Sequence, residues 1–336
     1  MRVPVLVTGG TGFVGSAAAR ALAARGHEPH VLARANADLS ILDGVDVRWH
    51  EGDLEDAASV ERAVAATCAA GERPWIVHSG AVISYRTRDA DLQRRVNVGG
   101  TRAVLQACRR HPVGRVLHVS SVVAVGHARP GETLDEEAAF NGAHLRCDYV
   151  DTKRAAEDLA LEAVGELDLV VVNPGAIFGP NPRGGNTVRF LRQLAEGRLG
   201  PLAPPGSLAV VGVDDVALGC LAALERGTSG RRYLLVESSH GMGDLFRLAA
   251  RLMGVRGPRR SVPVPLWRTL VAGASALDAL RPTDLLTPQT LRLLGVHFRF
   301  DATRARQELG WRPRPFEDVL RETIEFLRAR GELLAT

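Results

Sequence analysis

The sequence of 336 residues predicts an α/β fold in which helices cover both faces of a parallel sheet. Short β-branched runs alternate with Ala-rich helical segments through the first half of the chain, as in βαβ units. The runs VLVTG, WIVHSG and VLHVSS are apolar without alternation, which is typical of strands buried on both faces. We therefore expect a doubly wound sheet.

The expected elements follow one another regularly through the first half. Strands are predicted near residues 3–7, 29–33, 45–50, 75–78, 114–120 and 168–173. Helices are predicted between them, near residues 13–25, 56–68, 89–110 and 149–165. The first helix is expected to stop at Gly26, because a glycine after a helix accepts the left-handed conformation.

The second half has a different composition. Proline and glycine crowd residues 174–206, which marks loops and a boundary. A strand–helix–strand pattern returns in 208–237, so we expect this segment to pack back onto the sheet. The remainder is expected to be mainly helical. The predicted domains are 1–175 plus about 208–237, and a smaller, discontinuous one of about 176–207 plus 238–336.

Composition argues against several classes of function. The formal net charge is +4, and the arginines are dispersed among acids, so no nucleic-acid partner is expected. The four cysteines have neither CxxC pairing nor metal-ligand spacing, so no metal site is expected and a reducing, cytoplasmic setting fits. No secretory signal is evident in the first residues, which lead directly into an apolar strand.

The most apolar later stretch is LWRTLVAGASALDAL at 266–280. Arg268 and Asp278 interrupt it, and it is too short to span a bilayer, so no stable membrane insertion is expected. We predict a packed helix, with a helix that lies on a membrane surface as the alternative.

Three glycines, Gly9, Gly12 and Gly15, stand at the junction of the first strand and the first helix. In such a junction the first glycine permits a tight turn, the second lets a pyrophosphate approach the backbone, and the third lets the helix pack closely. Free N–H groups and the helix dipole then face the anion. The position of the pattern in the first βα unit predicts a nucleotide-binding sheet of the Rossmann type.

The end of the second strand selects the cofactor in such a sheet. An acid there would bind the ribose of NAD, whereas an arginine accommodates the 2′-phosphate of NADP. Arg34 occupies this place, and Asp38 is the first acid, so NADP is favoured and NAD is the alternative. Arg34 could instead stack on the adenine or face solvent. Asp53 and Leu54 follow the third strand, where the carboxylate could bind the adenine amine or only cap the next helix.

Lys153 is the only lysine in the chain, and it follows Tyr149 by one helical turn. A nearby ammonium would stabilise the phenolate and lower the pKa of the tyrosine. Ser120 and Ser121 end the fifth strand, and one hydroxyl could hold a substrate oxygen while Tyr149 transfers a proton. Asn97 is either part of this site or a polar bridge between helix and backbone.

The motifs TGGTGFVG, GDL, NVGGT, the serine pair, YxxxK and NPGxxxGP occur in the order of the extended short-chain dehydrogenase/reductase family, which this chain resembles over nearly its whole length. The resemblance, to a group also called the NAD-dependent epimerase/dehydratase superfamily, implies an oxidoreductase and assigns roles to residues. Its implied catalytic residues are Ser121, Tyr149, Lys153 and Asn97. Its implied cofactor-binding residues are Gly9, Thr11, Gly12, Phe13, Val14, Gly15, Arg34, Asp53, Leu54, Ser79, Gly80, Ala81, Tyr149, Lys153, Pro174 and Gly175, and Asn173 would also border the nicotinamide.

Two positions bear on the substrate. Nucleotide-sugar enzymes of the family commonly have an acid and a tyrosine where this chain has Arg34 and Val125, so it is closer to the dihydroflavonol-reductase-like and 3β-hydroxysteroid-dehydrogenase-like branch. The C-terminal segment also resembles hopanoid-associated sugar epimerase-like proteins. We expect hydride transfer between NADP(H) and a carbonyl/alcohol of a small, largely apolar substrate. Alternatives are a nucleotide-sugar epimerase or dehydratase with tightly bound NAD(P), and a non-catalytic NADP sensor; a homodimer is left open.

Overall fold

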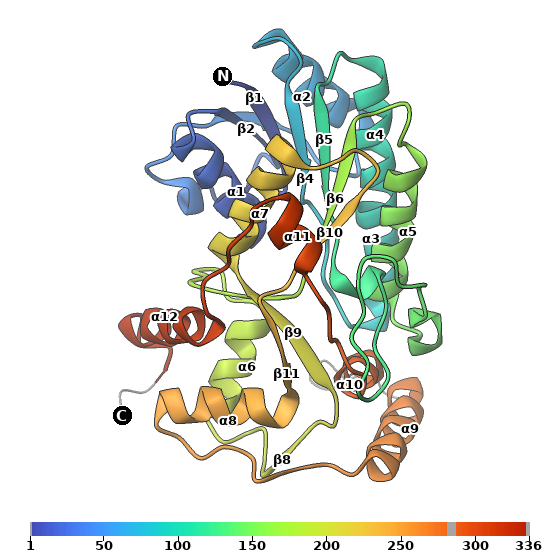
Figure 1. Cartoon of the computed structure of the whole chain (residues 1–336), viewed down its shortest axis with the longest axis vertical. Helices are drawn as coiled ribbons and strands as arrows, with labels where there is room; N and C mark the ends of the chain where they lie inside the picture. The colour runs from blue at the N-terminus through green and yellow to red at the C-terminus, as the bar shows by residue number, and fades with distance from the viewer. Residues whose placement is uncertain (1, 281–286, 334–336) are drawn as a thin grey trace.

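The computed structural model describes residues 2–280 and 287–333. Its main feature is a seven-stranded sheet in the order β10-β6-β5-β4-β1-β2-β3, in which every neighbouring pair is parallel (Figure 1). The strands are β1 (Pro4–Thr8), β2 (Glu28–Ala33), β3 (Arg48–Glu51), β4 (Trp75–His78), β5 (Arg115–Val119), β6 (Leu169–Pro174) and β10 (Arg232–Leu235). The predicted doubly wound sheet is therefore confirmed.

Helices cover both faces of this sheet. One face is covered by α1 (Phe13–Ala24) and α7 (Val213–Arg226), which also pack against each other. The other is covered by α2 (Ala57–Ala69), α4 (Gly100–Arg110) and α5 (Asp148–Glu162). Neighbouring residues of a strand point to opposite faces, so Val5 and Val7 pack in one cluster and Leu6 in the other. This explains why the strands are apolar without alternation.

One predicted helix has an irregular centre. The segment predicted as a single helix over 89–110 contains α3 (Ala90–Gln93), a π-helical stretch over Arg94–Gly99, and then α4. The π-helical stretch carries Asn97, which is buried. Hydrophobic spacing does not distinguish a π-helical turn from an α-helical one, so the sequence could not predict it.

The second half of the chain builds smaller layers below the large sheet (Figure 1). A three-stranded sheet has the order β11-β9-β7, and β12 pairs with β8. These strands are β7 (Ala176–Phe178), β8 (Leu202–Ala203), β9 (Ser207–Gly212), β11 (Ser238–Gly241) and β12 (Arg260–Ser261). The helices are α6 (Asn186–Ala195), α8 (Met242–Met253), α9 (Val264–Leu280), α10 (Pro288–Leu294), α11 (Thr303–Glu308) and α12 (Phe316–Ala329). None of the described helices combines the length and apolar content that crossing a bilayer requires.

The segment 208–237 divides between the two sheets. Strand β10 and helix α7 join the large sheet, whereas β9 lies in the small one. The expectation that the whole segment packs onto the large sheet is thus wrong for β9, because β9 is held by β7 and β11 instead. The division of the chain into two domains with the stated boundaries stays a prediction.

Helix α9 is less buried than expected of a packed helix. Among the described side chains of α9, one stripe faces the protein: Trp267 is buried, and Val271 and Ala274 are partly buried in the same small cluster. Leu266 and Leu270 are about half exposed, at 50% and 47%. The packed-helix expectation therefore holds for one face of α9 and is wrong for the other.

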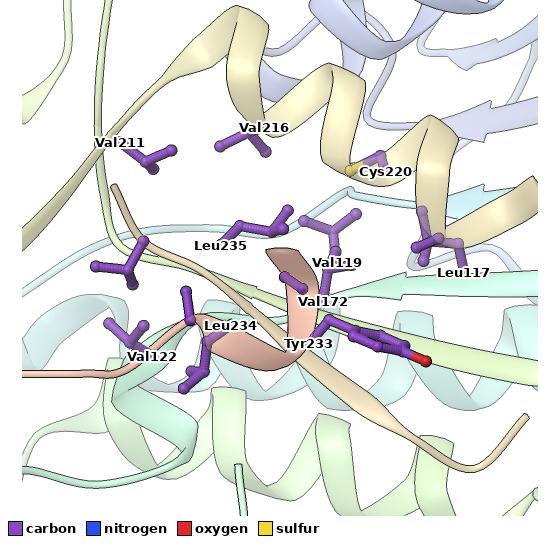
Figure 2. Close-up of a cluster of buried hydrophobic side chains, with 14 of the residues drawn as sticks. Leu117, Val119, Val122, Val172, Val211, Val216, Cys220, Tyr233, Leu234 and Leu235 are labelled. Carbon is purple, nitrogen blue, oxygen red and sulfur yellow. The ribbon is translucent and has the colours of Figure 1, made fainter. Parts of the chain in front are cut away.

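The largest buried cluster fills the space between the sheet and helix α7 (Figure 2). Leu117 of β5 and Val172 of β6 are fully buried, and Cys220 of α7 belongs to the same cluster. Interiors of this kind are close-packed, so removal of a large side chain leaves a cavity. This cluster holds β5 and β6 in place, and both strands lead into the candidate site described below.

Leu117→Ala should therefore lower the free energy of unfolding by about 2–5 kcal/mol, because a buried leucine loses both its transfer free energy and its contacts. Urea unfolding measures the loss. Leu218 of α7 is 53% exposed, so Leu218→Ala is the matched control, with an expected change within about 0.5 kcal/mol. Equal losses for the two variants would contradict this account of the core.

Candidate active site

The candidate site lies at the carboxyl ends of β1, β4, β5 and β6. The strand order reverses between β1 and β4, which makes this edge of the sheet the topological switch point. Open parallel sheets bind ligands at such a point, because the loops on either side of it lead away in opposite directions. All the groups discussed below reach this edge from the strand ends, from α5 or from loops that fold over it.

The glycine-rich turn between β1 and α1 is shaped by close backbone contacts. Gly9 has φ +70°, and a Cβ there would lie 2.6 Å from the Cα of Gly80. A Cβ on Gly15 would lie 2.2 Å from the carbonyl oxygen of Gly9. Gly12 is exposed and stands at the N-cap of α1 without a side-chain capping bond. The first helical N–H groups are therefore not blocked by a capping side chain, as binding of a pyrophosphate requires.

A second turn, after β4, supports the first. The Ser79 hydroxyl donates to the carbonyl oxygen of Thr8 at 2.7 Å, and Gly80 packs on Gly9. Leu54 packs under Gly80, while Ala81 is exposed beside it. These predicted cofactor residues are thus brought together with the glycine-rich turn.

Asp53 has mainly a local partner. Its carboxylate accepts a hydrogen bond from the backbone N–H of Glu55 at 3.0 Å, and its own N–H bonds the Ser59 hydroxyl. The helix that follows is capped by Asp56 instead. Asp56, and not Asp53, therefore caps the helix, so the capping alternative for Asp53 is wrong. The predicted binding of an adenine amine by Asp53 stays a prediction.

Two arginines lie near the end of β2. Arg34 is exposed there and has no ion pair with any described residue. Arg183, from the loop after β7, donates to the carbonyl oxygen of Thr11 and lies 3.6 Å from the carboxylate of Asp38. Arg183 was not predicted as a site residue. Only the Pro/Gly-rich composition of its loop pointed to this region, and nothing in the sequence paired it with Asp38.

Helix α5 carries Tyr149 and Lys153 to the end of β5. Acidic residues in its first turn, Asp148 and Asp151, suit the positive end of the helix dipole. Tyr149 and Lys153 are both buried, with 8% and 4% of their surfaces exposed. The ammonium of Lys153 donates to the carbonyl oxygen of Val119 at 2.9 Å, which fixes the side chain beneath the strand end.

Burial controls the proton affinities of this pair. It raises the pKa of Tyr149 to about 12, while a hydrogen bond with the Ser121 side chain acts in the opposite direction. It lowers the pKa of Lys153 to about 8, and the Glu157 carboxylate opposes that change. The expected lowering of the Tyr149 pKa is therefore wrong, because the loss of hydration outweighs the hydrogen bond with Ser121.

Of the two serines, Ser121 is the one that contacts Tyr149. Ser120 is buried, and its hydroxyl oxygen has no hydrogen-bond partner among the described residues. The side-chain oxygen of Asn173, at the end of β6, is likewise buried without a partner in this part of the chain. Buried polar atoms that lack partners are costly, so they mark places where a ligand can supply one. Pro174 and Gly175 follow Asn173, and a Cβ on Gly175 would lie 2.7 Å from the carbonyl oxygen of Ala209.

Asn97 is tied to the surrounding backbone. Its side chain accepts a hydrogen bond from the Val82 N–H at 2.7 Å and donates to the Val82 carbonyl and the Thr152 hydroxyl, at 3.0 and 3.1 Å. These contacts match the alternative of a bridge between helix and backbone. They hold the loop after β4 against α5, and a catalytic role for Asn97 stays a prediction.

Sequence reasoning missed a buried ionic network behind the site. Glu157 is fully buried one turn after Lys153, and its carboxylate accepts from the Asn173 amide at 2.6 Å and lies 3.2 Å from Arg232 of β10. Glu157 follows Lys153 by four residues, and this spacing was the only indication in the sequence that the two side chains lie on one face of a helix. The partners of Glu157 come from strands far along the chain. Tyr85 was also missed; its ring packs edge-to-face on Tyr149 at 5.9 Å.

The residues present fit a dinucleotide. The glycine turn has the close approaches that larger side chains would prevent, and α1 begins without a side-chain cap. Polar atoms of Ser120 and Asn173 that have no partner within residues 2–280 and 287–333 lie at the strand ends. The pyrophosphate would be held by the turn over residues 9–15, and the nicotinamide end would lie toward Tyr149 and Lys153.

Comparison with known proteins gives consistent results. The profile of the "NAD dependent epimerase/dehydratase family" matches residues 5–235. The chain is 34% identical to sterol demethylase protein B of Methylococcus capsulatus, over 97% of this chain and 98% of that protein. It is 29% identical to a 3 beta-hydroxysteroid dehydrogenase/Delta 5-->4-isomerase of Mycobacterium tuberculosis, over 92% and 86% of the two chains.

One solved structure is similar to this chain over its whole length. It is described as a nucleoside-diphosphate-sugar epimerase from Pseudomonas aeruginosa, and it matches with a TM-score of 0.79 and 25% identity. The match covers 99% of this chain and 100% of that one. The similarity therefore includes both the large sheet and the smaller layers below it.

The buried amine of Lys153 should leave a pH signature in stability. Its pKa is about 8 in the folded protein and 10.5 ordinarily, so between these values the unfolded chain binds more protons and folding becomes more favourable as pH rises. The free energy of unfolding of the wild type should rise relative to Lys153→Met by about 2 kcal/mol between pH 7 and pH 10. Urea unfolding of both proteins at several pH values measures this difference. A difference independent of pH would show that the lysine is not desolvated.

Proposed function

The chain belongs to the NAD-dependent epimerase/dehydratase family, and from this premise we propose that it is an NADP-dependent reductase or dehydrogenase. Its substrate would be a small, largely apolar molecule with a carbonyl that is interconverted with an alcohol. The observation that carries the proposal is the contact of the buried Tyr149 with Ser121, with the buried Lys153 one turn later on the same helix.

Each of these three side chains has a task in proton transfer. The dinucleotide, when bound, supplies or accepts the hydride. Ser121 would hold the substrate oxygen, and Tyr149 would give that oxygen a proton in the direction of reduction. A pKa of about 12 keeps Tyr149 protonated at neutral pH, which suits a proton donor. Lys153 would stabilise the phenolate that remains.

The proposed preference for NADP rests on the charges at the end of β2. Arg34 is exposed and has no acidic partner among the described residues, so it is available to a 2′-phosphate. Asp38, the acid that follows, already faces Arg183 at 3.6 Å. An acid engaged in this way is less suited to accept a hydrogen bond from the 2′-hydroxyl of NAD, so the charge pattern favours NADP.

The proposal of an apolar substrate rests on the loop after β4 and on the relatives. Asn97 holds this loop at Val82, and the next residue, Ile83, is 56% exposed. Tyr85, on the same loop, contacts Tyr149. An exposed isoleucine two residues before a partly buried tyrosine suits an apolar ligand. The names of two relatives refer to a sterol and a steroid.

A nucleotide-sugar epimerase is the second candidate, favoured by the solved structure described as such an enzyme. A panel of carbonyl compounds that includes steroid ketones, with NADPH oxidation as the readout, tests the reductase. Retention of the dinucleotide through purification, with no net oxidation in the panel, would favour the epimerase. Turnover of an apolar ketone with freely exchanging NADPH would support the first proposal.

Arg34→Asp should weaken NADPH binding by about tenfold or more, because it replaces a cationic partner of the phosphate with a repelling charge. Binding of NADH should improve, since the new carboxylate can accept from the 2′-hydroxyl. Isothermal titration with both cofactors measures the two affinities. Arg102→Asp, at an exposed position of α4, is the control. An unchanged preference in Arg34→Asp would show that Arg34 does not bind the 2′-phosphate.

Tyr149→Phe should lower kcat by about 10²–10⁴-fold, because it removes the proton donor, while NADPH affinity stays nearly unchanged. Lys153→Arg should also lower turnover, since a planar guanidinium cannot replace the buried ammonium. The limb of its pH–rate profile that belongs to Tyr149 should move to higher pH. Steady-state kinetics across pH, with a cofactor titration for each variant, measure these effects.

Tyr233→Phe is the matched control, because Tyr233 is also buried but bonds Thr228 and Glu308 away from the site. It should change stability and leave the pH–rate profile in place. Full activity and an unshifted profile in Lys153→Arg would disprove the role assigned to the only lysine of the chain.

A further inference from the structure

Exposed large apolar side chains gather at one end of the molecule. Seven described residues are large, hydrophobic and exposed, and four of them belong to β8 and α9: Leu202, Val264, Leu266 and Leu270. Strand β12 pairs its Arg260 with Leu202 and leads directly into α9, which joins the two parts in space. Figure 1 shows β8 and α9 at the bottom of the view, at the opposite end from the N-terminus.

The same surface is cationic. Residues 254–276 contain four arginines and no acid: Arg256, Arg259, Arg260 and Arg268. All four are exposed. None of them forms an ion pair with the part of the chain that the structure describes, although arginines elsewhere commonly do. The surface made by Leu202, these four arginines and the outer side of α9 is called the α9 surface below.

Helix α9 is held rigidly with this surface outward. The indole N–H of Trp267 donates to the carbonyl oxygen of Leu291 at 3.1 Å, and Arg292 donates to the Ser275 hydroxyl at 3.0 Å. These bonds fix α9 against α10. Leu266 and Leu270, one turn apart on the helix, consequently cannot turn inward to join the cluster around Trp267.

We propose that the α9 surface docks reversibly on the surface of a membrane that contains anionic lipids. Exposed leucines beside arginines are the pattern by which a helix lies in the interface plane, with apolar side chains among the acyl chains and cations at the headgroups. Helix α9 is too short and too interrupted to cross the bilayer, so the contact is peripheral.

The charge pattern favours a lipid surface over a second copy of the chain. A symmetric dimer through α9 would place arginines of one copy near those of the other, and Asp278, the one acid of residues 254–280, is half-buried and already has an interaction partner. An anionic membrane provides the opposite charge to every arginine at once. This inference concerns binding to lipid and does not depend on the proposed reaction.

Co-sedimentation with vesicles tests the proposal on the full chain. Vesicles of phosphatidylcholine with about one third phosphatidylglycerol should bind the protein, and those of pure phosphatidylcholine should bind it much more weakly. Arg259→Gln with Arg260→Gln should lower the partition constant by about fivefold per arginine, which corresponds to about 1 kcal/mol each. High salt should weaken binding of the wild type, because the exposed charges are screened.

Leu266→Ser with Leu270→Ser should also reduce binding, and this loss should persist in low salt. Leu218→Ser and Arg102→Gln are matched controls, because both positions are exposed on α7 and α4, helices that cover the large sheet. They should bind as the wild type does. Thermal unfolding verifies that all variants fold, as expected for changes at exposed positions.

Absence of binding to anionic vesicles would overturn the proposal. Equal losses of vesicle binding in the control variants would also overturn it, as would binding that depends neither on the charge of the lipid nor on the salt concentration. Sedimentation velocity without lipid tests the alternative that a second copy of the chain covers the α9 surface. A dimer that is abolished by Leu266→Ser with Leu270→Ser would support that alternative and would likewise overturn the proposal.

Discussion

The close backbone contact among Gly9, Gly15 and Gly80 is the constraint on which the site depends. A Cβ at Gly9 would overlap Gly80, and a Cβ at Gly15 would overlap the carbonyl of Gly9. The absence of side chains lets the turns after β1 and β4 touch and brings the start of α1 to the switch point of the sheet. Any larger residue would separate these segments, and the groups proposed to bind the two ends of a dinucleotide would no longer share one edge.

The position of Lys153 follows from packing as much as from sequence. Helix α5 covers the sheet next to β5 and β6, so its inward stripe must be buried, and Lys153 is part of that stripe. The cost of a buried ammonium is offset by the Val119 carbonyl and by Glu157. Glu157 is in turn held by Asn173 and Arg232. Two buried histidines, His78 and His118, lie near Lys153. Burial, and in second place the positive charge of Lys153, lowers the pKa of both imidazoles, so they stay neutral and add no positive charge.

Sequence reasoning predicted β1, β2, β4, β5 and β6 to within one residue at each end, because each contains a short apolar run between glycines or polar residues. Strand β3 was predicted to begin three residues too early, because its residues, Arg48–Glu51, are mostly polar. The glycine turn and the pair Tyr149–Lys153 were also predictable, since each is a local pattern. Partners from distant segments were not: Arg183 reaches Asp38, and Arg232 reaches Glu157, only because of the way the chain folds. The exposed face of α9 was missed because apolar periodicity does not reveal how much of a helix its neighbours cover.

The ion pair between Glu157 and Arg232 also bears on the order in which the protein can fold. Strand β10 lies beside β6, yet the chain builds β7, α6, β8, β9 and α7 between them. Its neighbour Leu234 also donates a backbone hydrogen bond to Glu136 at 3.0 Å, so β10 satisfies buried acids from two earlier segments. During synthesis, Glu157 lacks its arginine and Glu136 lacks the Leu234 N–H until residues beyond 234 have emerged. Contacts of such long sequence separation slow folding, and a nascent chain that ends before β10 exposes an incomplete sheet edge.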